Sequence, residues 1–193
     1  WVTIDGFTVT RTEDRAIELG DACTHIALTR DTVSFSREKG IVVSGGSDIV
    51  IGSNVVHDCG EHGIELSGGA TSCVVEDNDS FRNAHPTVRM ANGIYLHQAT
   101  GNVLRRNRTH HNQDSGVHFQ TQANDNVSYL NRSWLNGDHG FDHLGATGTI
   151  HLCDVAYGNY KDGFSIEGQA TGTQLHDCIA IDNGLTTNEF NLW

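Results

Sequence analysis

The side chains best suited to chemistry lie at one position of a short phrase that recurs along the chain. The phrase is a glycine, an apolar residue, a variable residue and a second, usually apolar residue, as in residues 116–119 and 163–166. The variable residues of successive copies are Glu65, Tyr95, His118, Asp142 and Ser165. Imidazole, carboxylate and phenol groups are the side chains that general acids and bases use. We therefore expect this position to carry the function.

A second group of candidates lies in the turn before each phrase. Asp114 and Asp138 stand four residues ahead of His118 and Asp142. If the repeats stack in register, Asp114, Asp138 and Asp142 converge on one spot, where three carboxylates repel one another unless a cation is present. Hard oxygen ligands in this number suit Ca2+. Aspartate before glycine is also a common turn former, as at Asp162, so a metal site and a purely structural turn are both open interpretations.

Lysine, histidine and tyrosine complete this cluster. Lys161 occupies the same turn position one repeat later and is a candidate base if the turn brings it to the site. His139 follows Asp138, and histidine is a poor Ca2+ ligand but a good ligand of transition metals. His118 titrates near neutral pH and is another candidate base, and Tyr95 could act as one if a neighbouring cation activates it.

Other polar residues flank these positions and are candidates for holding a substrate. The next outward position, two residues along the same phrase, carries polar side chains, and Arg89 lies on a segment inserted before Tyr95. Arg89 could clamp a substrate carboxylate or be a simple surface charge. The expected substrate-binding residues are Glu65, Arg89, His97, Gln120 and Glu167.

The elements that position these residues are predicted by the repeat itself. The glycines of the phrase recur after 23, 30, 23, 24 and 23 residues, at Gly40, Gly63, Gly93, Gly116, Gly140 and Gly163. The long interval predicts an inserted loop around residues 84–88. Each repeat holds two or three short β-type runs separated by Asn, Asp and Gly, with no room for a helix of about ten residues. Leucine-rich and helical repeats are therefore disfavoured.

Two columns of asparagine indicate how the repeats stack. One column is Asn54, Asn78, Asn107, Asn131 and then Asp154; the other is Asn83, Asn112, Asn136, Asn159 and Asn183. Asparagine tolerates a left-handed backbone, and its amide can bond the identical amide one layer away. The sequence therefore predicts an all-β solenoid of about eight coils, in which the phrase forms one strand of each coil.

Side chains alternate along a strand, so the residues on either side of the variable position must face the core. The inward residues are Ile41, Ile64, Ile94, Val117, Phe141, Phe164 and Phe190, followed two positions later by Val43, Leu66, Leu96, Phe119, His143, Ile166 and Leu192. The variable position, from Val42 to Asn191, then faces solvent. His143 interrupts the apolar pattern, and because the repeat is one residue short after it, a local bulge could turn its ring outward.

The turn acids and the Gly-Phe-Asp phrase resemble those of polysaccharide lyases of the pectate-lyase type, particularly family nine. The resemblance covers nearly the whole chain and implies a right-handed parallel β-helix. It also implies that Asp114, Asp138 and Asp142 bind Ca2+, with His139 where the family has a further aspartate. The catalytic lysine of the family corresponds to Ser165, which cannot serve as a base.

Residues 139–143, His-Gly-Phe-Asp-His, more loosely resemble the Tyr-Gly-Phe-Asp-Pro-His motif of mannuronan C5-epimerases, which share this fold. His139 replaces the tyrosine, and His143 stands one position early for the histidine, which makes His143 a further catalytic candidate. Lyases and epimerases both neutralise the substrate carboxylate so that C5 can lose its proton. They differ in whether a leaving group departs or the proton returns on the other face, and the sequence does not separate them.

The composition of the chain limits the kinds of partner that it could bind. The net charge of −12 argues against nucleic acid, whose phosphates require a basic surface. No apolar run is long enough to span a membrane, and no signal peptide is recognisable. The five cysteines form no Cys-x-x-Cys pair, so zinc and redox motifs are not supported. We expect a monomer, secreted or at the cell surface by resemblance, and we expect the single β-helix domain of residues 1–193 to be a segment of a longer protein.

The leading hypothesis is an enzyme that acts on an acidic, uronate-containing polysaccharide by metal-assisted β-elimination. A non-catalytic carbohydrate-binding or surface-adhesion β-helix is the alternative, favoured by the missing outward lysine. The confinement of carboxylates and histidines to two adjacent coils favours the enzyme. A C5-epimerase and a glycoside hydrolase with two carboxylates on adjacent coils are further alternatives on the same fold.

Overall fold

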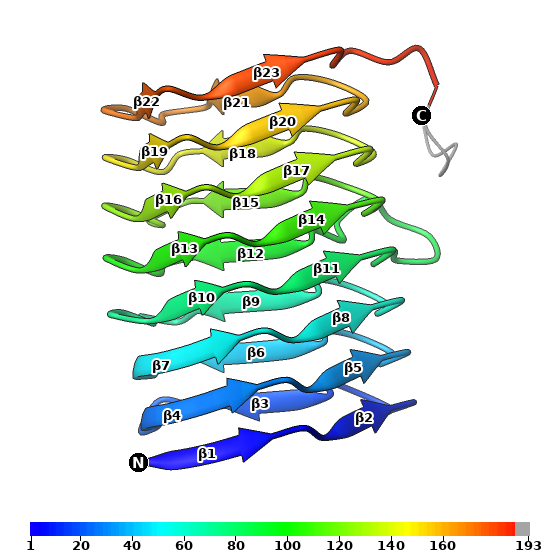
Figure 1. The fold of residues 1–193 in the computed structure, drawn as a ribbon, viewed down its shortest axis with the longest axis vertical. Helices are drawn as coiled ribbons and strands as arrows, with labels where there is room; N and C mark the ends of the chain where they lie inside the picture. Colours follow the sequence, from blue (N-terminus) through cyan, green and yellow to red (C-terminus); the bar gives the residue numbers. More distant parts are fainter. Residues whose placement is uncertain (188–193) are drawn as a thin grey trace.

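The computed structural model describes residues 1–187, which form a stack of coils with three parallel β-sheets along its sides (Figure 1). Each complete coil contributes one strand to each sheet, and β1 and β23 lie at opposite ends of the stack. The all-β solenoid of about eight coils is thereby confirmed. The predictions made for Phe190, Asn191 and Leu192 lie outside the described residues. No helix in the described part of the chain is long and apolar enough to cross a membrane.

Two of the sheets have eight strands each. The first, sheet A, contains β1 (Val2–Asp5), β4 (Thr24–Thr29), β7 (Ser47–Gly52), β10 (Val74–Glu76), β13 (Val103–Arg105), β16 (Val127–Tyr129), β19 (Ile150–Leu152) and β22 (Gln174–His176). The second, sheet B, contains β2 (Thr8–Thr10), β5 (Thr32–Ser34), β8 (Val55–His57), β11 (Asp79–Phe81), β14 (Arg108–His110), β17 (Arg132–Trp134), β20 (Val155–Tyr157) and β23 (Ile179–Ile181).

The third sheet, sheet C, is built from the recurring phrase and carries the candidate site on its outer face. Its seven described strands are β3 (Ile17–Leu19), β6 (Ile41–Ser44), β9 (Ile64–Ser67), β12 (Ile94–His97), β15 (Val117–Gln120), β18 (Phe141–Leu144) and β21 (Phe164–Glu167). The residues flanking the variable position are buried in β6 to β15, as the alternation predicts. In the last described coil Phe164 is only half-buried and Ile166 is 48% exposed, because that coil lies at the end of the stack.

The glycine that opens each phrase is required by packing and not by its backbone angles. A Cβ atom on Gly116 would lie 1.9 Å from the Oγ atom of Ser133, and one on Gly140 would lie 2.7 Å from the carbonyl oxygen of Gly163. These distances are too short for a real Cβ atom, so only glycine fits at this corner of the coil. The start of each sheet C strand from β6 to β21 is therefore fixed against sheet B, and with it the direction of the variable side chain.

Both predicted asparagine ladders are present in the interior corners. The backbone N–H and the side-chain Nδ2 of Asn78 both donate to Oδ1 of Asn107, at 3.1 and 3.0 Å, and the second ladder repeats this pattern between Asn112 and Asn136. A third, shorter ladder, which we did not predict, joins Cys73, Asn102 and Asn126. Since buried N–H groups are costly without acceptors, these ladders hold the register between coils.

Candidate active site

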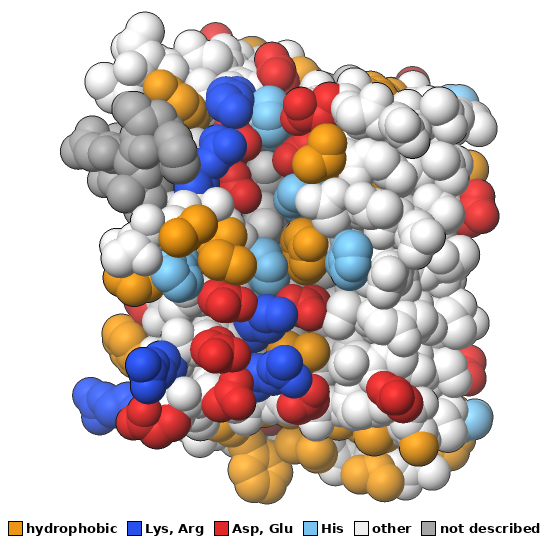
Figure 2. Space-filling model, turned by 180° about the vertical axis from the view of Figure 1, so that it is seen from behind, with side chains coloured by type: hydrophobic (Ala, Val, Ile, Leu, Met, Phe, Trp, Pro, Cys, Tyr) orange, Lys and Arg blue, Asp and Glu red, His pale blue; other side chains and the backbone are white. Residues whose placement is uncertain are grey.

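The candidate site lies on the outer face of sheet C and on the turns that lead into it. Figure 2 looks onto this face and shows acidic, basic and histidine side chains gathered in one band that runs along the stack. The parallel register confirms the predicted column, in which each variable residue pairs with the variable residue of the next coil. The expectation that these side chains face solvent is wrong, since Val42, Glu65, His118, Asp142 and Ser165 are each at most 8% exposed. In chain order the column is Glu65, Tyr95, His118, Asp142 and Ser165.

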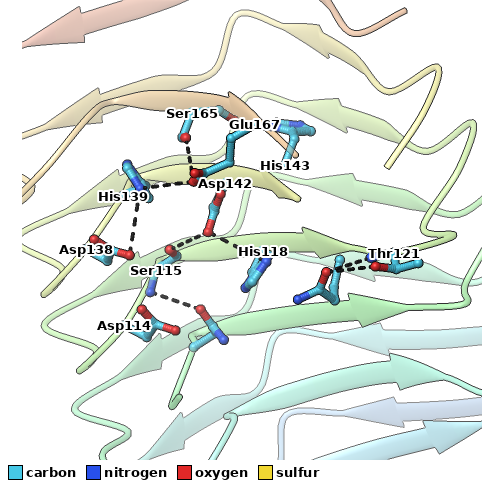
Figure 3. A network of polar contacts seen from close by, with 12 residues as sticks. Asp114, Ser115, His118, Thr121, Asp138, His139, Asp142, His143, Ser165 and Glu167 are labelled. Atoms are coloured by element: carbon cyan, nitrogen blue, oxygen red, sulfur yellow. Dashed lines mark hydrogen bonds and ion pairs between the residues drawn. The ribbon is translucent and has the colours of Figure 1, made fainter. Parts of the chain in front are cut away.

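The three aspartates converge as expected (Figure 3). The backbone N–H of Asp138 donates to the carbonyl oxygen of Asp114 at 3.1 Å, so the two turns stack directly. Burial raises the pKa of Asp142 to about 7, and the carboxylates of Glu167, Asp138 and Asp114 add to this shift. Burial also raises the pKa of Asp114 to about 6; Arg89 opposes that shift and Asp138 adds to it. Crowded carboxylates of this kind attract a cation.

Two cationic side chains reach this cluster. Nη1 of Arg89 lies 2.8 Å from Oδ2 of Asp138, and its Nε lies 3.4 Å from Oδ1 of Asp114. Nζ of Lys161 lies 2.8 Å from Oδ1 of Asp138. The inserted loop thus delivers Arg89 to the site, and the interpretation of Arg89 as a simple surface charge is wrong. Lys161 also reaches the site, as its candidacy required. An ammonium group paired with a carboxylate, however, supplies positive charge and does not accept a proton.

His118 is the most unusual group of the site. It is only 7% exposed, and neither ring nitrogen makes a hydrogen bond to any described residue. Its Nε2 lies 3.6 Å from Oδ2 of Asp142, which is too long for a hydrogen bond. Burial lowers the pKa of His118 to about 4, with Asp138 opposing the shift, so the ring is neutral at neutral pH. The ring is therefore a neutral imidazole whose two buried nitrogens have unused hydrogen-bonding capacity.

Tyr95 lies between His118 and a histidine of the preceding coil. Its ring stacks on His62 at 4.1 Å between centroids and meets the His118 ring edge-on at 5.4 Å. Burial, with Glu65 and Asp114 adding to it, raises the pKa of Tyr95 to about 12, so its phenol keeps its proton. Tyr95 is therefore placed to donate a proton and not to act as the base.

His139 is oriented as a hydrogen-bond donor. Its Nδ1 accepts the backbone N–H of Asp162 at 3.2 Å, so in the neutral ring Nε2 carries the proton. That nitrogen lies 3.7 Å from Oδ2 of Asp138 and 3.6 Å from Oε1 of Glu167. A metal ligand needs a bare nitrogen toward the ion, and this orientation does not provide one.

The aspartates, by contrast, fit a calcium ion. Ligand atoms of Asp138, His139 and Asp142 lie within 4.8 Å of one another, and Asp114 borders them. Oδ1 of Asp142 is buried and has no hydrogen-bond partner within residues 1–187, while its Oδ2 accepts the hydroxyl of Ser115 at 3.3 Å. An orphaned carboxylate oxygen beside two further carboxylates is the environment that Ca2+ prefers.

Two predicted substrate-binding residues lie apart from this cluster. Oε1 of Gln120 accepts from the backbone N–H and the hydroxyl of Thr121, so its side chain is turned back onto its own strand end. Glu65 pairs with Lys39 at 2.7 Å, one coil beyond Tyr95. His97 and Glu167 do flank the site: His97 stacks 6.3 Å from Tyr95, and Glu167 accepts the hydroxyl of Ser165 at 3.0 Å.

His143 points into the core. Its ring is 0% exposed and stacks on Phe119 at 4.8 Å, so the expectation that a bulge turns it outward is wrong. The repeat is one residue short after His143, and this shortening is accommodated after the strand, at Gly145. Gly145 has a φ of 78° and forms an isolated bridge to Gln120. A catalytic role for the His143 ring would require contact with substrate, and this burial prevents it.

Sequence reasoning missed three contributors: Lys39, His62 and Ser115. All three directly precede the glycine of a phrase, the position that His139 occupies in its coil. The signal was therefore present as a second column beside the variable one. Nδ1 of His62 accepts the backbone N–H of Asn92 at 3.2 Å, as His139 does for Asp162, so this column also caps the next turn.

Known proteins resemble the chain in sequence and in structure. It is 28% identical over 174 residues to a pectate disaccharide-lyase of Dickeya chrysanthemi, covering 78% of this chain and 23% of that enzyme. The chain thus spans about a quarter of its relative's length. Among solved structures, the periplasmic alginate epimerase AlgG matches with a TM-score of 0.75 and 16% identity, over 92% of this chain and 46% of that one.

The pectate lyase Pel9A matches with a TM-score of 0.71 and 17% identity, over 94% of this chain and 58% of that one. Identities this low show a common fold. The model of the right-handed beta helix region matches residues 1–189. The handedness expected from the resemblance is thereby confirmed, and the chain belongs to the right-handed β-helix family.

Proposed function

We propose that this β-helix carries the active site of an enzyme that removes the C5 proton of a uronate in an acidic polysaccharide, with β-elimination as the outcome. The observation that carries the proposal is His118, a buried, neutral imidazole with no hydrogen-bond partner among the described residues, beside a cluster of carboxylates and cations. The name of the pectate disaccharide-lyase relative supports the choice of substrate and reaction.

In this proposal His118 accepts the C5 proton, because it is the imidazole of the column and both of its nitrogens lack hydrogen-bond partners among the described residues. Its low pKa belongs to the ligand-free site, and a uronate carboxylate bound nearby would strengthen it as a base. Tyr95, whose raised pKa keeps the phenol protonated, donates to the leaving glycosidic oxygen from the adjacent strand. His139 offers its Nε2 proton as a hydrogen bond to the sugar.

Positive charge at the substrate carboxylate is the other requirement, since a carbon acid next to a carboxylate is very weak. Arg89 and Lys161 lie at the cluster and can provide part of this charge. We propose that Asp114, Asp138 and Asp142 hold Ca2+, which when bound would neutralise the substrate carboxylate. Because Arg89 and Lys161 already pair with Asp138, the cationic side chains and the metal share the same carboxylates.

Two of the three alternatives, the glycoside hydrolase and the non-catalytic module, fit the geometry less well. Glycoside hydrolases need one carboxyl group as an acid and a second as a base or nucleophile, whereas Asp138 is held by two cations, Arg89 and Lys161. A spacer or adhesion module has no use for a buried imidazole without partners, which costs stability. The alginate epimerase AlgG, which shares this fold, is periplasmic, and we propose that this protein likewise acts outside the cytoplasm.

The test is a screen on polygalacturonate, polymannuronate and polyguluronate, with added Ca2+ and with chelator. We expect ultraviolet absorbance from the unsaturated product on at least one polymer. Inversion at C5 detected by NMR without absorbance would instead identify an epimerase, and reducing sugar without absorbance a hydrolase. Retention on a polyuronate affinity gel with no reaction would leave a binding module and overturn the enzymatic proposal.

A further inference from the structure

The core behind the candidate site contains three hydrogen-bonded polar side chains, those of His143, His151 and Asp154. Nδ1 of His143 lies 2.9 Å from the carbonyl oxygen of Ser165, and its Nε2 lies 2.9 Å from Nε2 of His151. Nδ1 of His151 lies 2.7 Å from Oδ2 of Asp154. All three side chains are 0% exposed. His151 stands in the inward column of sheet A, level with Val75 and Leu104 of lower coils.

The contacts among these side chains need one more hydrogen than two neutral imidazoles and an ionised carboxylate supply. There are three contacts of hydrogen-bond length, and each needs one hydrogen, because two facing lone pairs repel. A carbonyl oxygen and an ionised carboxylate supply none, and two neutral imidazoles supply one each. The three side chains are therefore one proton short unless they bind an additional one, whatever tautomers the two rings adopt.

The surroundings favour keeping that proton. The His151 ring is enclosed by the rings of Phe119, Phe141 and Phe164, at 5.7, 5.3 and 5.5 Å. Among residues 1–187, the titratable groups near these side chains are His118, which acts on His143 from the outer face, and Cys153 and Cys178, which lie near Asp154; none brings a positive charge at neutral pH. Without the proton, Asp154 would leave an uncompensated negative charge in this apolar space, which is expensive.

We propose that His151 and Asp154 form a buried imidazolium–carboxylate pair that holds this proton and makes the stability of the C-terminal coils dependent on pH. The proton lies on His151, because Oδ1 of Asp154 accepts both the backbone N–H of Asn131 at 2.6 Å and its Nδ2 at 3.2 Å, and a carboxylate with two N–H donors stays ionised. Asp154 occupies the position that asparagine holds in most lower coils of the same ladder, so the His151–Asp154 pair takes the place of one asparagine of that ladder. This inference is independent of any activity of the outer face.

Asp154→Asn is the decisive variant. The amide keeps the acceptor for Asn131 and donates an N–H to Nδ1 of His151, so all three contacts are made by neutral groups. Above pH 7 the unfolded wild-type chain holds no extra proton and the native one holds one, so stability falls as pH rises. Relative to Asp154→Asn, the wild-type unfolding equilibrium constant should rise about tenfold per pH unit, or about 100-fold from pH 7 to pH 9, in urea titrations.

Asp31→Asn is the matched control. Asp31 stands lower in the same ladder, with its backbone N–H bonded to Asn54, and among the described residues it has no histidine partner, so its substitution should leave the pH slope unchanged. Equal slopes for wild type and Asp154→Asn would overturn the proposal. Histidine ¹⁵N NMR of the wild-type protein at pH 8 provides a second readout. Two protonated nitrogens on His151 are expected, and one bare nitrogen would contradict the proposal even if Asp154→Asn failed to fold.

Discussion

Two histidines on neighbouring strands show how this molecule separates structure from function. His118 on β15 and His143 on β18 are both buried, at 7% and 0% exposure. Both ring nitrogens of His143 are paired, with the Ser165 carbonyl oxygen and with His151. Both ring nitrogens of His118 lack hydrogen bonds within the described chain. One faces inward and the other outward, because they lie one residue apart in register.

A buried polar group without a partner lowers stability, while a paired one contributes to it. The core ring of His143 is therefore explained by the fold alone. The outer ring of His118 is not, and it is best explained by a ligand that completes its hydrogen bonds. The comparison therefore places the proposed chemistry on the outer face of sheet C and not in the interior. Variants of Asp138, His118 and Arg89 test the outer face, and His143→Leu tests the interior.

The largest effect is expected for Asp138→Asn on the outer face. Asp138 holds Arg89 and Lys161 at 2.8 Å each and is a proposed calcium ligand, so its loss removes several charges from their positions at once. We expect activity on the best polyuronate to fall about 1,000-fold, measured as the rate of product absorbance. Asp125→Asn, on an exposed turn beside sheet A, is the control and should behave as wild type. Retention of a tenth or more of the activity by Asp138→Asn would remove Asp138 from the site.

His143→Leu tests the role of the histidine that faces the core. The substitution leaves Nε2 of His151 without a partner in the core, so the free energy of unfolding should fall by about 1–3 kcal/mol in urea denaturation. Activity well below the melting temperature should stay within about twofold of wild type, because the ring does not reach the outer face. An active-site role for His143 would show as a large loss of activity in the folded variant.

The pH dependence of the free energy of unfolding tests the burial of His118 on the outer face. Its folded pKa of about 4 lies below the value of about 6.5 for an unfolded histidine, so between these values the unfolded chain binds a proton that the native chain does not. Stability is therefore lost as pH falls from 6.5 to 4. Relative to His118→Gln, the wild-type protein should lose about 1–3 kcal/mol across this window. Parallel curves for the two proteins would mean that His118 is solvated in the native state.

The smallest effect is expected for Arg89→Gln. Removing a cation that pairs with Asp114 and Asp138 should tighten Ca2+ binding about tenfold in isothermal titration calorimetry, because the metal no longer competes with the guanidinium. Arg108→Gln, whose partner Asp79 lies on sheet B, is the matched control. An unchanged affinity would place the ion away from these aspartates, and no detectable binding by either protein would exclude a calcium site.

The fold is predictable because each repeat restates the same constraints. Gly116 and Gly140 mark the corner, Asn78 and Asn107 mark the ladder, and alternation then assigns every side chain of the phrase to one face. The same alternation is enough to predict that the variable residues of successive coils share one outward column. The ladder at Asn102 and Asn126 was missed because it is short and lies in a different corner.

The parts of the site that were not predictable depend on geometry outside the repeat. Arg89 lies on the one inserted loop, whose path no periodicity fixes. The turning of Gln120 onto Thr121 is a local choice among rotamers, and the orientation of His139 is set by a single backbone N–H from Asp162. The polar core at His151 could have been found, since a histidine in an inward column beside the inward His143 is visible once the sheet A columns are aligned.

The most direct test of the central claim is the activity of His118→Gln, an uncharged replacement of similar size, assayed beside His143→Leu on the same polyuronate. We expect His118→Gln to lose about 100- to 1,000-fold in rate while its unfolding midpoint at pH 7 is equal to or above that of wild type. Wild-type activity in a folded His118→Gln protein would contradict this expectation, because the unpaired imidazole would then have no part in the reaction.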